Sequence, residues 1–136
     1  MDIQVIDVDP ITRQVSFTLK ARKVTGISKL IQIVVLSLMN TPGRDVLSPD
    51  KGAGLPSLVG SNIDVNDSTE LYGEIAQRVR KSEREIIADQ IGINDPASEK
   101  LAELRIINIE QGETLDQILV TIRVINQEGL ATDITV

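Results

Sequence analysis

The chain has 136 residues, a length typical of one domain, and its 41% hydrophobic and 25% charged residues are typical of globular proteins. A net charge of −6 argues against binding to a phosphate backbone, and Phe17 and Tyr72, the only aromatic residues, are too few to build a stacking platform for bases or sugars. The absence of histidine and cysteine excludes imidazole bases, thiolate nucleophiles, disulfides and the commonest zinc ligands. We expect one globular domain over residues 1–136, with no cofactor, no metal and no nucleic-acid partner.

Residues 2–24 predict a β-hairpin. Apolar residues alternate with polar ones in two runs, which are separated by a turn at residues 9–12. Pro10 suits that turn because its φ is fixed and it donates no backbone hydrogen bond.

Residues 26–40 carry the strongest helical pattern. One continuous apolar face is formed by Ile27, Leu30, Ile31, Val34, Val35 and Leu38. Thr25 precedes this face as the candidate N-cap. Ile33 and Leu36 widen the apolar stripe, so we expect a core helix that is covered on more than one side.

Residues 40–67 lose all periodicity and contain three of the five prolines and four of the nine glycines. A long irregular connection in a small domain is typically a functional loop. The glycines match neither a dinucleotide-binding fingerprint nor a phosphate-binding loop. We therefore expect them to let the backbone bend sharply or press against a neighbour.

A second helix is predicted from about Ser68 to the stop signals at Gly92 and Pro96. Its buried side is expected to comprise Leu71, Ile75, Val79, Ile86 and Ile87, with a gap at Ser82 and Glu83. Basic and acidic residues alternate over residues 74–85. This pattern predicts a solvated face with ion pairs such as Glu74–Arg78. One further short helical turn is predicted at residues 96–102.

The C-terminal part predicts antiparallel strands at residues 104–110, 118–125 and 130–136. The element order, β-β-α-loop-α-β-β-β, predicts an α+β fold without parallel βαβ units. The last strand leaves a potential sheet edge. Such an edge is either covered by the rest of the protein or available for the addition of a partner's strand.

Catalytic arrangements are weak in this sequence. The acidic pairs Asp45 with Asp50 and Asp64 with Asp67 lie in polar loops, where nothing local would raise a carboxyl pKa. Ser28 and Lys29 are adjacent on a helix and therefore do not face each other. We expect a protein that is not an enzyme.

The stretch that follows the core helix carries a family resemblance. Pro49, Gly52 and Leu55 match the spacing of a family pattern that reads Pro-x-x-Gly-x-x-Leu. Thr41 and Gly43 stand where the same pattern has Leu-x-Thr-x-x-Gly, but here the spacing is Leu-x-x-Thr-x-Gly. The chain thereby resembles the baseplate wedge family of contractile phage tails, whose members act as sheath initiators. The resemblance implies a structural virion protein of the tail baseplate, made in the host cytoplasm, with six copies around the tail axis.

The family resemblance also implies partner-binding residues. Wedge proteins would bind the signature loop at Arg44, Pro49 and Gly52. They would also bind a Glu-Pro-Arg contact, for which the candidates in this sequence are Glu103 with Arg105 and Glu83 with Arg84. The tail sheath protein would add a strand to the surface formed by residues 118–136, for which the candidate residues are Leu130, Thr132, Ile134 and Val136. The tail tube is a further candidate partner.

Two alternative functions come with this resemblance. Related proteins occur in the baseplates of type VI secretion systems and R-type bacteriocins, and the family has carried a lysozyme-like label, which suggests a peptidoglycan hydrolase.

A membrane partner is not expected, because the most apolar run, residues 30–39, has about half the length that a bilayer span requires.

Overall fold

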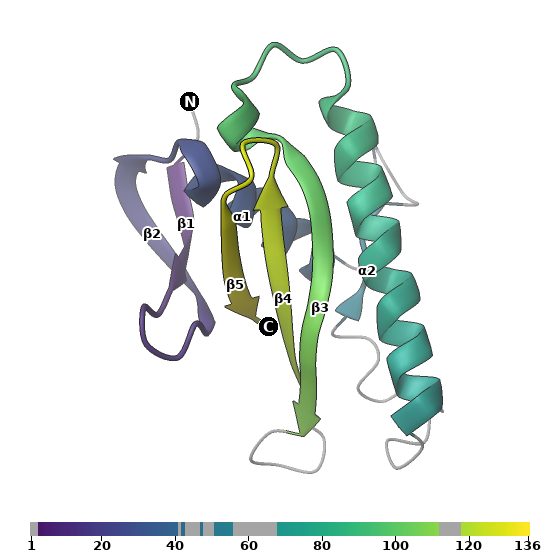
Figure 1. Ribbon diagram of the computed structural model, residues 1–136. Helices are drawn as coiled ribbons and strands as arrows, with labels where there is room; N and C mark the ends of the chain where they lie inside the picture. The colour runs from purple at the N-terminus through teal and green to yellow at the C-terminus, as the bar shows by residue number, and fades with distance from the viewer. Residues whose placement is uncertain (1–2, 41, 43–46, 48–50, 56–67, 112–117) are drawn as a thin grey trace.

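The computed structural model describes residues 3–40, 42, 47, 51–55, 68–111 and 118–136 (Figure 1). In chain order, its elements are β1 (Ile3–Val8), β2 (Val15–Lys23), α1 (Gly26–Met39), α2 (Ser68–Gln90), a short 3₁₀-helix (Ala97–Glu99), β3 (Leu101–Gln111), β4 (Ile118–Asn126) and β5 (Ala131–Thr135). The fold is α+β, which confirms the prediction. Among the residues described, no helix combines the length and the apolar character needed to cross a bilayer.

The strands form two antiparallel sheets. β1 and β2 form the predicted N-terminal hairpin, and β3, β4 and β5 form a sheet with β4 in the centre. In Figure 1, α1 lies behind the three-stranded sheet, α2 runs along its β3 side, and the hairpin lies on its β5 side. A single parallel bridge between Gln14 and Thr135 joins the hairpin to β5.

The core lies between α1 and the inner face of the three-stranded sheet. Alternate residues of β4 are buried, as are the predicted apolar positions of α1 except the partly buried Ile27. The largest fully buried apolar side chains are Leu30, Val34, Val35, Leu38, Ile75, Leu101, Ile122, Val124 and Ile134. All of them are aliphatic, in keeping with the scarcity of aromatic residues.

Two expectations about α1 need correction. Leu36 is 44% exposed, so the prediction that it widens the buried face is wrong, whereas Ile33 is partly buried against the core. Thr25 has the extended backbone of an N-cap, but its side chain makes no capping hydrogen bond. The helix is therefore held by its buried face rather than by its cap.

The helical turn predicted at residues 96–102 is shorter in the structure. Only Ala97–Glu99 form a 3₁₀-helix, because Leu101 already pairs with Asn126 at the start of β3. Pairing within the sheet thus prevents the helix from continuing.

The hairpin turn is fixed by a carboxylate. Asp9 Oδ1 accepts hydrogen bonds from the backbone N–H groups of Ile11 (2.8 Å) and Thr12 (3.0 Å). These bonds, first that from Thr12 and then that from Ile11, lower the pKa of the Asp9 carboxyl. The turn continues into Arg13, whose φ of 60° is left-handed.

Candidate functional site

The outer edge of β5 is the first candidate site, because it borders the sheet on the hairpin side. Val120 and Val136 exchange two backbone hydrogen bonds (3.0 and 2.9 Å), and Asn126 N–H donates to Leu130 O (3.0 Å). Because bonded and non-bonded pairs alternate in an antiparallel ladder, the backbone groups of Thr132 and Ile134 also point toward β4. Those of Ala131 and Asp133 therefore point away from it.

The hairpin contacts this edge near one end of β5. Thr135 N–H donates to Arg13 O at 2.9 Å, next to the bridge between Gln14 and Thr135. No strand of the described chain pairs with the outer side of Ala131 or Asp133. The C-terminal end of β5 is thus covered, and its N-terminal half remains open.

The outer edge of β3 is the second candidate, and α2 covers it. Glu83 Oε2 accepts a hydrogen bond from Leu104 N–H at 2.8 Å. One end of the same strand is held by Gln90, whose side-chain oxygen accepts from Leu101 N–H at 2.8 Å and whose amide donates to Glu99 O at 3.0 Å. Two side chains of α2 therefore take the place of a neighbouring strand along this part of β3.

The two Glu/Arg candidates prove to be neighbours. Glu103 and Arg105 form an ion pair (3.1 Å) on the exposed face of β3, on either side of Leu104. Glu83 accepts a hydrogen bond from the N–H group of the same Leu104, although the two residues are 21 positions apart in the sequence. Arg84 is exposed on the next position of α2. The structure brings together residues that the sequence offered as alternatives.

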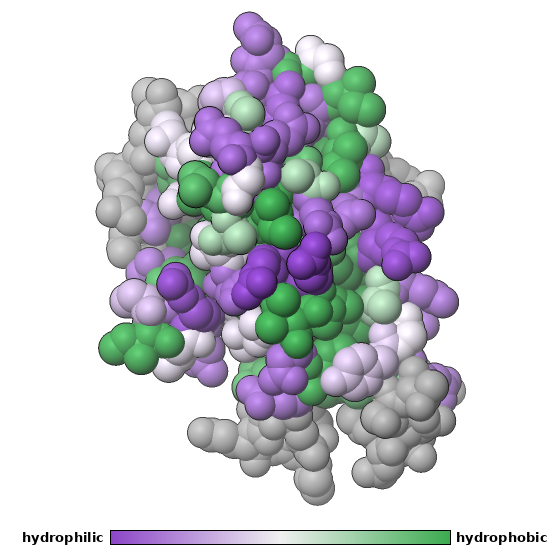
Figure 2. Space-filling model, viewed as in Figure 1, coloured by the Kyte–Doolittle hydropathy of each residue, from purple (hydrophilic) through white to green (hydrophobic). Residues whose placement is uncertain are grey.

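The outer face of the sheet carries a row of charges across its strands. Arg105, Arg123 and Asp133 are register partners on β3, β4 and β5. Arg123 Nε donates to Asp133 Oδ1 at 2.8 Å, with a second bond at 3.3 Å. Figure 2 shows hydrophilic residues mixed with hydrophobic ones over this face.

The ion pair between Arg123 and Asp133 shifts the pKa of both side chains. The hydrogen bond from Arg123 lowers the pKa of the Asp133 carboxyl, and the positive charges of Arg123 and Arg13 add to that effect. The same hydrogen bond raises the pKa of Arg123. Asp133 is therefore charged at neutral pH, on the strand whose edge is open.

The four C-terminal candidates differ in accessibility. Leu130 is 55% exposed in the turn before β5, and Thr132 and Val136 are half-buried. Ile134 is fully buried. Its side chain holds β5 against the core and is not available to a partner.

In the signature loop, Gly52 has an internal role, and Arg44 and Pro49 lie outside the described residues. Gly52 has a φ of +109°, and a Cβ there would collide with the backbone oxygen of Asn40. The expected bend and close approach are confirmed at this position. The neighbouring backbone is joined to the end of α1, since Ala53 N–H donates to Ser37 O (3.0 Å) and Gly54 N–H to Asn40 O (2.9 Å).

Side chains of α2 bind the backbone of residues 52–54 on the other side of this loop segment. Glu85 accepts from Gly52 N–H (3.0 Å), Lys81 donates to Gly52 O (3.0 Å), and Arg78 donates to Gly54 O (2.6 Å). The predicted Glu74–Arg78 pair is present (3.0 Å). The prediction of a merely solvated face is nevertheless incomplete, because these charges also bind backbone groups of residues 52–54.

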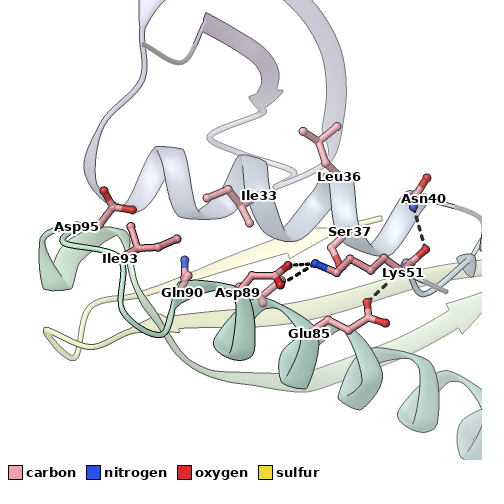
Figure 3. A pocket seen from close by; sticks show the side chains of 12 residues that line it. Ile33, Leu36, Ser37, Asn40, Lys51, Glu85, Asp89, Gln90, Ile93 and Asp95 are labelled. Carbon is pink, nitrogen blue, oxygen red and sulfur yellow. Dashed lines mark hydrogen bonds and ion pairs between the residues drawn. The ribbon is translucent and has the colours of Figure 1, made fainter. Parts of the chain in front are cut away.

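A groove of about 490 Å³ lies between α1 and the C-terminal half of α2 (Figure 3). Lys51 crosses it to contact both carboxylate oxygens of Asp89 at 2.6 Å. The exposed Leu36 and Ile93 line its wall. The charged groups that Figure 3 shows in contact are thus already used to fix the loop segment.

The described residues contain no group of three His, Cys, Asp or Glu side chains placed to hold a metal ion. Lys29, which the sequence offered beside Ser28, forms an ion pair with Glu99, with 3.7 Å between Lys29 Nζ and Glu99 Oε1. The acidic pairs of the connecting loop lie outside the described residues.

No protein-family model, no curated protein and no solved structure matches the chain.

The edge contacts of α2 are what sequence reasoning missed, although a signal was present. Ser82 and Glu83 interrupt the apolar stripe of α2 where it should be buried. In the structure Ser82 is fully buried and its hydroxyl lies 2.9 Å from that of Ser37, while Glu83 binds β3. Polar residues inside a buried stripe indicate specific hydrogen-bond partners.

Proposed function

We propose that the protein is a non-enzymatic structural subunit of a contractile-tail baseplate, and that it binds an extended arm of a sheath subunit by strand addition at β5. The observation that carries this proposal is the outward direction of the backbone groups of Ala131 and Asp133 at an edge that the described chain leaves open. Such groups are a template for a further strand.

The choice of a baseplate rests on the resemblance of residues 38–55 together with the element order. The part of this stretch that the structure describes has a structural role: Gly52 fits closely against Asn40, and Leu55 packs against the core. The same stretch is tied to both helices.

Anchoring to wedge proteins is assigned to the surface where α2 meets β3. The Glu103–Arg105 pair is about half exposed, so the energy it contributes to the isolated fold is small. Its charged groups remain accessible to a partner. Around a sixfold axis, this surface would hold each copy in place while β5 receives the sheath arm.

Strand addition is tested with a proline that affects only the outward side of β5. Ala131→Pro removes an outward N–H group and places a ring on the open edge, but it leaves the hydrogen bonds to β4 in place. Removing residues 130–136 is a poorer test, because that deletion also removes the buried Ile134. Ala131→Val is the matched control, since it keeps the N–H group.

The readout is sheath length on particles assembled with each variant, observed by electron microscopy. We expect baseplates with both variants, extended sheaths with Ala131→Val, and few or no extended sheaths with Ala131→Pro. Sheaths of normal length and number with Ala131→Pro would contradict strand addition at this edge.

A further inference from the structure

A second surface of the molecule combines positive charge with a depression. A hollow of about 540 Å³ beside α2 is lined by four cationic side chains, those of Arg78, Arg80, Lys81 and Arg84. Glu74 is the acidic residue among its described lining. This concentration of positive charge stands out in a protein with a net charge of −6.

Two of these cations are fixed by the protein itself. Arg78 donates to the carbonyl oxygens of Ala53 (3.2 Å) and Gly54 (2.6 Å) and pairs with Glu74. Lys81 donates to Gly52 O at 3.0 Å. Lys81 Nζ also lies 3.6 Å from Glu85 Oε1, so each of these two cations has a carboxylate partner of its own.

The other two cations have no such role. Arg80 and Arg84 are both exposed, and within the described part of the chain neither has a hydrogen-bond or ion-pair partner. They stand four residues apart on α2, a spacing at which like charges repel each other and weaken the helix. Both guanidinium groups therefore line the hollow without an anionic partner in the described part of the chain.

We propose that this hollow, the basic depression, binds an acidic segment of a protein partner through carboxylates held by Arg80 and Arg84. A guanidinium group binds a carboxylate through two parallel hydrogen bonds, and Arg80 and Arg84 are the two cations of this lining that have no carboxylate partner within the described chain. The proposal goes beyond the strand addition at β5, because the basic depression lies on α2 and involves other residues.

The chemistry of the surroundings favours carboxylates over a nucleic acid. A polyanion that followed its phosphates beyond the basic depression would meet a protein of net negative charge. The described lining also contains no aromatic ring on which a base could stack. A short acidic peptide segment fits both conditions.

The test is a titration of the ¹⁵N-labelled full chain with a short poly-glutamate peptide at low salt, followed by NMR. We expect the side-chain Nε–H signals of Arg80 and Arg84 to shift, and the shifts to disappear at high salt. Arg84→Glu should weaken binding by about tenfold or more, because it replaces a charge-assisted hydrogen-bond donor with a like charge. Lys100→Glu makes the same charge change outside the basic depression and should leave the affinity within about twofold.

Several outcomes would overturn the proposal. They are the absence of shifts at Arg80 and Arg84, an equal loss of affinity in Arg84→Glu and Lys100→Glu, and tighter binding of a single-stranded oligonucleotide of the same charge. The experiment uses the isolated chain and does not involve β5. Its failure would leave the proposed sheath binding untouched.

Discussion

The two edges of the three-stranded sheet are treated differently by the rest of the chain. Along β3, α2 supplies Glu83 and Gln90 as acceptors for the N–H groups of Leu104 and Leu101. Along β5, the hairpin supplies one backbone acceptor, Arg13 O, near the C-terminal end. An unpaired edge is a hazard for a soluble protein, and side chains or bulges usually protect it.

The difference shows which edge is closed by the protein's own chain. Polar residues of α2 cover the outer edge of β3, and one of them, Glu83, interrupts the apolar stripe of that helix. The sequence of α2 therefore provides the groups that close this edge. Among the residues that the structure describes, none comparably covers Ala131 and Asp133 of β5. Its inner face is nevertheless fixed to the core by Ile134, so the open edge is presented by a well-anchored strand.

The largest expected effect tests this anchoring. Ile134→Ala removes a fully buried side chain and should lower the free energy of unfolding by about 2–5 kcal/mol. Leu130→Ala, at an exposed position of the preceding turn, should change it by about 0.5 kcal/mol or less. Urea denaturation of both variants gives the comparison. Equal stabilities would mean that β5 is not held by its inner face.

The second effect tests the closed edge. Glu83→Ala leaves the N–H group of the buried Leu104 without its acceptor and should cost about 1–3 kcal/mol. Glu83→Gln keeps an acceptor oxygen and should cost less. Glu103→Ala serves as an exposed control and should lie within about 0.5 kcal/mol of the unmodified protein. If Glu83→Ala is as stable as this control, α2 does not close β3.

A smaller effect is expected at the open edge. Ala131→Pro removes an N–H group that has no partner in the described chain, so stability should change by only about 0.5 kcal/mol. Thr132→Pro removes a group that points toward β4 and should cost about 1–3 kcal/mol more. Thermal unfolding of the pair measures the difference. A similar loss in both variants would show that the outward side of β5 is already occupied.

The smallest effect concerns pH. The pKa of Asp133 is lower in the folded protein than its ordinary value of 3.8, so its ion pair contributes stability above that pH. This contribution is lost as the pH falls through the lower folded value. Asp133→Asn should therefore flatten the acid limb of stability slightly, since both side chains are partly exposed and screened by water. If the free energy of unfolding depends on pH equally steeply in both proteins below about pH 4, the lowered pKa of Asp133 is contradicted.

The sequence predicted elements better than contacts. The apolar stripe of α1 and the alternation in β4 depend on local spacing, and both are found within a residue or two of the expected bounds. Gly52 also behaved as expected, because a positive φ and a close neighbour are what glycine permits. These features are readable because each is decided by a few adjacent residues.

The candidate site was less predictable because its contacts join distant residues. Glu83 and Leu104 meet only once α2 lies beside β3, and Thr135 meets Arg13 only once the hairpin turn reaches β5. The charges of α2 were interpreted from their sequence neighbours as a solvated face. Their backbone acceptors in residues 52–54 lie more than twenty residues away in the chain.

A reconstruction of the assembled tail base that contains this protein would test strand addition at β5 directly. We expect an extended strand from a sheath subunit beside β5, bonded to the outward backbone groups of Ala131 and Asp133, while α2 still covers β3. A β5 edge that remains free in the assembled particle, or a sheath strand paired with β3 instead, would contradict it.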